Sequence, residues 1–187
     1  MAKKSKKKND NMSLIFNVIV IALGVLALCT IFMPVFNIDN ILGGVLDYSI
    51  KGSDVISGAF ASELSSEMTA GAAKMYTLRT LDDMSFVANV FAYGYILTLV
   101  LSCAGIVFAV LNILKLKFKM VNTIIGAVWA LLVVVTFIFA IVLSSKYASI
   151  NTLGNTVTSK AVMAVGTYFL IAVLGGGLLQ FYSATKK

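Results

Sequence analysis

Few side chains in this sequence could do chemistry. The chain has no histidine, eight carboxylates, and two cysteines that stand alone at Cys29 and Cys103. Asp82 and Asp83 are neighbours that could bind a cation, but they also end a Thr-Leu-Asp-Asp stretch that fits a capping box. We expect them to cap a helix that begins at Leu81.

These residue types argue against several classes of membrane enzyme and carrier. Without histidine the chain lacks the commonest metal ligand and proton shuttle. A disulfide-forming enzyme needs paired cysteines, an intramembrane serine protease needs a base beside its nucleophile, and a four-helix multidrug exporter needs a carboxylate within the membrane. The sequence shows none of these arrangements, so we expect no enzymatic activity, no catalytic residue, no metal ion and no cofactor.

Four windows of the sequence contain no charged side chain, and they predict the secondary structure that positions the other residues. The windows are Asn11 to Ile38, Met84 to Leu114, Met120 to Ser145 and Ala161 to Thr185. A helix needs about 20 apolar residues to cross a membrane, so each window can span once. The runs are continuous and do not alternate, which favours helices over a barrel. The sequence therefore predicts an all-α membrane protein, a bundle of four transmembrane helices.

Lysines predict the orientation, because Lys and Arg are retained on the cytoplasmic side. Residues 1–10, 115–119 and 186–187 hold five, three and two lysines, whereas 39–83 and 146–160 together hold five basic and seven acidic residues. Both termini and the turn with Lys115, Lys117 and Lys119 are therefore predicted to be cytoplasmic. The predicted order is a basic tail at 1–12, helices at 13–36, 84–114, 120–144 and 160–183, an extracytoplasmic segment at 37–83, a turn at 115–119, an outer loop at 145–159 and a cytoplasmic end at 184–187.

The basic tail and the first helix each have a second interpretation. The tail could bind nucleic acid or anionic lipid, and the helix could be a cleaved signal peptide. We favour an orientation signal and no nucleic-acid partner, because the tail adjoins the first crossing. We favour an uncleaved helix, because its uncharged window of 28 residues is long and Leu28 stands where a lipoprotein cleavage box needs a small residue.

The extracytoplasmic segment is too long for a simple connector and is predicted to fold. Alternation of polar and apolar residues over 45–50 predicts a short strand, and a helical period from Asp54 predicts an amphipathic helix near 54–78. The apolar face of this helix is formed by Ile56, Phe60, Leu64, Met68 and Met75. We expect the face to be covered by the bundle itself, by the outer leaflet or by a partner.

Small residues recur at a similar depth in the inner half of the windows, and such residues let helices approach closely. They are Gly24, Gly105, Ala109, Gly126, Ala130, Ala172, Gly175, Gly176 and Gly177. The outer half is rich in aromatic residues. We therefore expect a bundle that closes toward the cytoplasm, and whose outer half either opens as a pocket near Tyr93, Tyr95 and Tyr168 or is filled by the rings.

The predicted topology resembles that of the claudin-like tetraspan proteins. Both have the two termini inside, a long outer loop, a short inner turn and a shorter outer loop. The resemblance is one of topology. Claudins carry a Trp, a Gly-Leu-Trp and two cysteines in the long loop, where this chain has neither Trp nor Cys, and its single tryptophan is Trp129. The resemblance implies lateral assembly or partner binding through the outer segment.

We therefore expect a non-enzymatic membrane protein that lies in the lipid bilayer and binds other membrane proteins or its own copies. The alternative is a small transporter or channel subunit for an uncharged or lipid-like substrate. Its path would be lined by polar residues of the windows, among them Asn17, Thr98, Asn112, Asn122 and Thr136. Fourteen lysines against the single Arg79 are typical of an AT-rich genome, which favours a bacterial cytoplasmic membrane.

Overall fold

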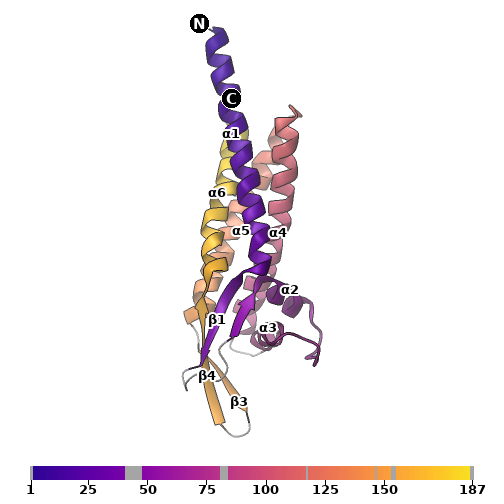
Figure 1. The fold of residues 1–187 in the computed structure, drawn as a ribbon, viewed down its shortest axis with the longest axis vertical. Coiled ribbons are helices and arrows are strands. Elements are labelled where there is room, and N and C mark those ends of the chain that lie inside the picture. Colours follow the sequence, from indigo (N-terminus) through magenta and orange to yellow (C-terminus); the bar gives the residue numbers. More distant parts are fainter. Residues whose placement is uncertain are drawn as a thin grey trace. The chain divides into compact units, whose positions relative to one another are not determined.

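The computed structural model describes residues 2–40, 48–80, 84–116, 118–145, 147–152 and 155–185. Its contacts divide the chain into two compact units. The helical unit comprises Met1–Leu28, Leu97–Val134 and Ile171–Lys187, and the sheet unit comprises Cys29–Ile96 and Val135–Leu170. Figure 1 shows the helices and strands of both units.

Four helices are long and apolar enough to cross a membrane (Figure 1). They are α1 (Ala2–Cys29), α4 (Ser85–Ile113), α5 (Lys119–Ser145) and α6 (Val165–Thr185). The first span covers Met12–Phe32, and its 21 residues correspond to about 31 Å of helix. Within each helix the backbone satisfies its own hydrogen bonds, which the hydrocarbon core requires. The predicted set of four helices of membrane-spanning length and composition is thus confirmed.

Two of these helices have bounds that differ from those the sequence predicts. The first is predicted to reach residue 36, but α1 ends at Cys29 and only the 3-10 turn η1 (Thr30–Phe32) follows. Pro34 restricts the residue before it, and Met33 is extended with ψ of 150°, so the helix cannot continue. The fourth is predicted to begin at residue 160, but α6 begins at Val165 because the preceding residues pair as a strand.

In the helical unit, neighbouring helices meet at glycines. The contacting pairs are Gly24 with Ile106 (α1 and α4), Gly105 with Trp129 (α4 and α5), Gly126 with Gly177 (α5 and α6), and Gly176 with Leu23 (α6 and α1). Each helix therefore has two neighbours, and the four close a ring. Gly105 also faces Gln180, so α4 and α6 meet across the interior of that ring.

The sheet unit contains an antiparallel sheet whose strands lie in the order β2, β1, β4, β3. The strands are β1 (Pro34–Asn40), β2 (Tyr48–Lys51), β3 (Tyr147–Thr152) and β4 (Asn155–Met163). The central pair joins β1 to β4, with Phe36 opposite Met163, so the segments after the first and third spans share one sheet. The sequence predicts only one of these strands, near 45–50, because the pairing partners lie far apart along the chain. Residues 41–47 lie outside the described part.

Two short helices, α2 (Gly52–Phe60) and α3 (Ala70–Thr80), replace the single helix predicted near 54–78. The backbone becomes extended at Ala61, and α3 begins anew after Thr69, whose hydroxyl accepts a hydrogen bond from the Ala72 amide at 3.2 Å. The two helices pack closely at Gly58, where an added Cβ would lie 2.8 Å from the Ala72 carbonyl oxygen. The periodicity continues across the break, which is why the sequence alone suggests one helix.

The core of the sheet unit is aromatic. The Phe36 ring of β1 meets the Phe91 ring of α4 edge-on at 5.0 Å, and the Phe91 ring stacks on Tyr95 at 6.2 Å. All three side chains are fully buried, and the Tyr95 hydroxyl is 2.8 Å from the Thr30 hydroxyl. A register irregularity between Pro34 and Phe36 lets the consecutive residues Val35 and Phe36 both be buried.

Candidate functional site

The small residues predicted to pack helices all belong to the helical unit. Seven of them are buried: Gly24, Gly105, Ala109, Gly126, Ala130, Gly176 and Gly177. Gly175 is half-buried, and an added Cβ there would make only an ordinary 3.5 Å contact with Leu23. Ala172 is exposed. Close approach is thus concentrated on one face of α6, the face that carries Gly176 and Gly177.

Inside the helical unit, four amide side chains form one chain of hydrogen bonds, with one amide from each long helix. Gln180 of α6 donates to Asn122 of α5 at 3.1 Å, and Asn122 donates to Asn112 of α4 at 3.2 Å. Asn112 donates to Asn17 of α1 at 3.5 Å, and Asn17 donates to the Ser13 carbonyl oxygen at 2.9 Å. The amides of Asn17, Asn122 and Gln180 are at most 4% exposed. Such a chain ties the four helices together in a fixed register.

Three of these amides, Asn17, Asn112 and Asn122, are recognisable in the sequence as polar residues of the windows, whereas Gln180 was not predicted. The sequence does contain a signal for it. Each of the other three uncharged windows has a side-chain amide, and Gln180 is the side-chain amide of the fourth window. Two other polar residues named with them, Thr98 and Thr136, are fully buried, in the helical unit and the sheet unit respectively. The Ser102 hydroxyl donates to the Thr98 backbone carbonyl oxygen at 2.7 Å, so the hydrogen bond of Ser102 stays within α4.

Two buried polar atoms of the described residues have no hydrogen-bond partner, and both belong to the helical unit. They are the Gln180 Oε1 oxygen and the Trp129 Nε1 nitrogen. Both side chains pack against Gly105, where an added Cβ would lie 2.9 Å from Trp129 Cζ3 and 3.0 Å from Gln180 Oε1. The open acceptor, Gln180 Oε1, therefore lies directly beside the closely packed Gly105.

The turn between α4 and α5 is closed by its own backbone. Lys115 has φ of 67°, its amide donates to the Asn112 carbonyl oxygen at 3.0 Å, and the Leu116 amide donates to the Leu111 carbonyl oxygen at 2.9 Å. This pair of bonds is the usual end of a helix in which one residue adopts the left-handed conformation. Lys115 and Lys119 are exposed, and Lys117 lies outside the described residues.

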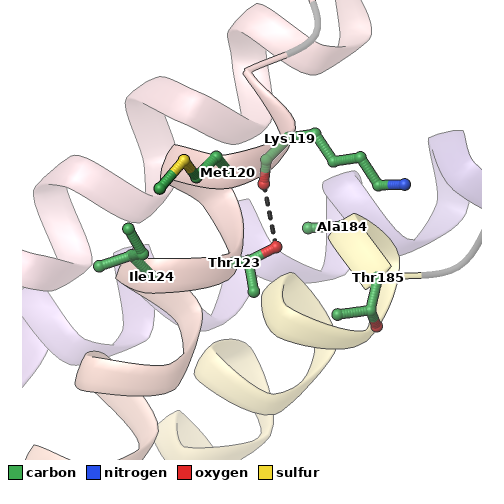
Figure 2. Close-up of a pocket in the computed structure, with 6 residues that line it drawn as sticks. All are labelled: Lys119, Met120, Thr123, Ile124, Ala184 and Thr185. Atoms are coloured by element: carbon green, nitrogen blue, oxygen red, sulfur yellow. Dashed lines mark hydrogen bonds between the residues drawn. The ribbon is translucent and has the colours of Figure 1, made fainter.

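An open groove of about 500 Å³ lies between the first turn of α5 and the last turn of α6, in the helical unit (Figure 2). It is lined by Lys119, Met120, Thr123, Ile124, Ala184 and Thr185. The two threonine hydroxyls already donate to carbonyl oxygens of their own helices, Thr123 to Lys119 and Thr185 to Phe181. The groove thus offers apolar walls and the Lys119 ammonium, but no polar group held ready for a ligand.

The three tyrosines predicted near an outward pocket lie in the sheet unit with different surroundings. Tyr95 is fully buried and bonded to Thr30, so its hydroxyl does not face an open space. Tyr93 is 44% exposed, and its hydroxyl accepts a hydrogen bond from Arg79 at 3.1 Å. Tyr168 is 54% exposed. None of the three lines the groove at Lys119.

Arg79, which sequence reasoning passed over, joins three elements of the sheet unit. From α3 it donates to the Asn89 side chain of α4 at 2.7 Å and to the carbonyl oxygens of Gly58 and Ala59, each at 2.5 Å. Those carbonyls end α2, where a cation is favourable. The guanidinium also lies 5.4 Å from the centre of the Tyr93 ring. A single planar group with five donors therefore holds α2 and α3 against α4.

Asp54 joins α2 to α3 at the other end of α2, its first turn. Its carboxylate accepts the Lys51 amide at 2.8 Å and the Thr69 hydroxyl at 2.6 Å. Gly71 lies so close that an added Cβ would come within 2.5 Å of the carboxylate. One buried anion thus stabilises the first turns of both α2 and α3, where negative charge is favourable.

The predicted apolar face of the outer helix is divided between covered and exposed residues. Met75 is fully buried in the sheet unit, and Ile56 and Met68 are half-buried. Phe60 is 70% exposed and Leu64 is 62% exposed. Much of the face is therefore covered by the contact between α2 and α3, and the two largest side chains near the break are left uncovered.

Lys74 of α3 is only 5% exposed, and this burial lowers its pKa from 10.5 to about 8. Between these two pH values the unfolded chain binds more protons than the folded chain, so stability rises with pH across that window. We expect the thermal unfolding midpoint of the full chain in detergent to rise from pH 8 to pH 10 and the Lys74→Met variant to lose this rise. An equal rise in both proteins would contradict the assignment.

Among the described residues, no group of three or more Cys, Asp or Glu side chains could hold a metal ion. The features described above are a hydrogen-bonded interior in the helical unit and a clamped helix pair in the sheet unit. Comparisons with protein-family models, with curated proteins and with solved structures find no match to this chain.

Proposed function

We propose that this is a non-enzymatic integral membrane protein that binds other membrane proteins or its own copies through its outer segment, residues 37–83, and the faces of its helices. The Lys115 turn and both termini lie in the cytoplasm, and the outer segment (residues 37–83) and the outer loop (residues 145–159) lie outside. The lysine distribution supports this orientation. The lysine bias also supports a bacterial cytoplasmic membrane. The topological resemblance to claudin-like proteins agrees with lateral assembly.

The observation that carries the proposal is the exposure of Phe60 and Leu64 on a segment that belongs to none of the four spans. Large apolar side chains that are exposed outside the membrane-spanning helices are candidates for contact with another protein. The segment is also held in place, because Arg79 binds the end of α2 and Asp54 binds the start of α3 through Thr69. Binding therefore costs little conformational entropy there.

The experiment compares the full-length protein with a Phe60→Ser/Leu64→Ser variant after purification from its membrane in mild detergent. The measurements are the amount of stoichiometric partner chain and the oligomeric mass. Removing two apolar contacts is expected to weaken association about tenfold or more. Glu63→Gln, an exposed change in the same segment, is the matched control.

Retention of the same partner and the same mass by the Phe60→Ser/Leu64→Ser variant would overturn the proposal. An amine-reactive label added outside intact cells checks the orientation in the same preparation. It is expected to reach Lys51 and to spare Lys115, both of which are exposed in the structure.

A second function, passage of an uncharged or lipid-like substrate, is favoured by the buried amides of the helical unit. A transport path needs polar groups that can exchange partners with the substrate. Asn17, Asn112 and Asn122 are bonded to one another, and this arrangement stabilises the helix contacts. Association therefore remains the first proposal.

A further inference from the structure

We propose that the interior of the helical unit binds a hydroxyl group beside Gly105, with the hydroxyl donating its hydrogen bond to Gln180 Oε1. This inference does not depend on the proposed function. It starts from the close contact at Gly105, beside which the buried Gln180 Oε1 has no hydrogen-bond partner. Gln180 is 2% exposed and Trp129 is fully buried.

The direction of the amide chain requires the Gln180 oxygen to be the open one. Asn122 donates to the Phe118 carbonyl oxygen at 2.9 Å, which fixes its nitrogen on that side and makes its oxygen an acceptor. Only the nitrogen of Gln180 can bond to that oxygen. The Gln180 oxygen must therefore point the other way, toward Gly105. Rotating the amide would create two facing acceptors at Asn122, so the open acceptor is a consequence of the network.

An open acceptor at this depth is costly. A buried carbonyl without a donor costs about 1–3 kcal/mol, and such groups are seldom left so in folded proteins. The missing side chain at Gly105 means that α4 presents bare backbone to the Gln180 oxygen. The chain itself thus provides an acceptor but no donor among the described contacts.

The chemistry of the site selects an uncharged donor. The four windows hold no charged side chain, so a cation would have no counter-charge there. A hydroxyl is neutral and can donate its hydrogen bond to Gln180 Oε1. Its source is either water or the hydroxyl of a neutral lipid such as diacylglycerol.

Gln180 and Trp129 are the only glutamine and the only tryptophan in the chain, so each gives a single spectroscopic signal. The experiment uses the full-length protein with glutamine ¹³C-labelled only at the side-chain Cδ, in phosphatidylcholine bilayers with or without diacylglycerol, because the Gln180 backbone carbonyl already accepts a hydrogen bond from Ser183. Infrared spectroscopy reports whether the Gln180 carbonyl is hydrogen-bonded. Solid-state NMR reports whether magnetisation reaches that carbon from water.

A hydrogen-bonded carbonyl with transfer from water identifies water as the ligand. A carbonyl that becomes hydrogen-bonded only with diacylglycerol identifies the lipid hydroxyl. Either result supports the proposal. A carbonyl that vibrates as a free group in both bilayers overturns it.

Two alanine variants extend the test. Gly105→Ala places a methyl group 3.0 Å from the Gln180 oxygen and is expected to abolish the hydroxyl signal. Gly175→Ala, whose methyl meets only Leu23 at 3.5 Å, is the matched control and is expected to retain it. Retention of the hydroxyl signal in the Gly105→Ala variant would also overturn the proposal that the hydroxyl lies beside Gly105. If Gly105→Ala fails to fold, the wild-type measurement still decides the question.

Discussion

Alanine at Gly126 is expected to disrupt the helical unit, whereas alanine at Gly175 leaves it intact. An added Cβ at Gly126 would clash with the Phe181 backbone nitrogen and would lie 2.9 Å from the Gly177 carbonyl oxygen. These are backbone atoms, so the clash is relieved only if α5 and α6 move apart. Overpacking of this kind costs about 3 kcal/mol. The measurement is the unfolding midpoint of the purified protein in a denaturing detergent titration.

Gly175→Ala is the matched control for that experiment, because it adds the same methyl group to the partner helix α6 at an ordinary contact distance of 3.5 Å. Gly177→Ala is a second test, since its Cβ would lie 2.7 Å from the Ala130 backbone nitrogen on the opposite side of the same contact. Equal midpoints for Gly126→Ala and Gly175→Ala would show that the backbones of α5 and α6 do not meet at Gly126.

Replacement of Arg79 by lysine is expected to release α2 and α3 from α4 although the positive charge is kept. Lysine presents one compact ammonium and cannot reach the Gly58 and Ala59 carbonyls, Asn89 and the Tyr93 hydroxyl together. Leaving partly buried carbonyls without donors costs about 3 kcal/mol in total. Hydrogen exchange should therefore become faster across Gly52–Phe60 and Ala70–Thr80.

The amides of α1 and of residues 97–113 in α4 provide the internal reference for the Arg79 experiment, since they belong to the helical unit. Lys51→Met is the matched control variant, because it removes an exposed cation from the same unit. The clamp would be refuted if Arg79→Lys and Lys51→Met exchanged at the same rate across both short helices.

The sequence predicts those parts of the fold that depend on contact with lipid. The four spans follow from long uncharged runs, because lipid admits no charge and no unpaired backbone along a helix. The close packing at Gly105, Gly126 and Gly176 follows from the spacing of small residues in these runs. The identity of each contacting helix pair does not follow from that spacing, since it depends on how the helices are arranged around the interior.

The candidate sites were less predictable, because their residues come together only through tertiary contacts. Asn17, Asn112 and Asn122 are recognisable in the sequence as polar residues in apolar runs, but their connection through Gln180 requires all four helices. In the sequence, Arg79 is a single basic residue on the polar side of a predicted helix. Its hydrogen-bond partners come from α2 and α4. Neither arrangement has a local pattern.

By itself the sequence determined the number of membrane spans and the positions where helices can approach closely, because both depend on the hydropathy and size of residues along one helix. Only the tertiary structure decided that β1 pairs with β4, that the predicted outer helix breaks into α2 and α3, and that an amide chain ends in an open oxygen. Those features arise from hydrogen bonds between residues far apart in the chain, which no local periodicity records.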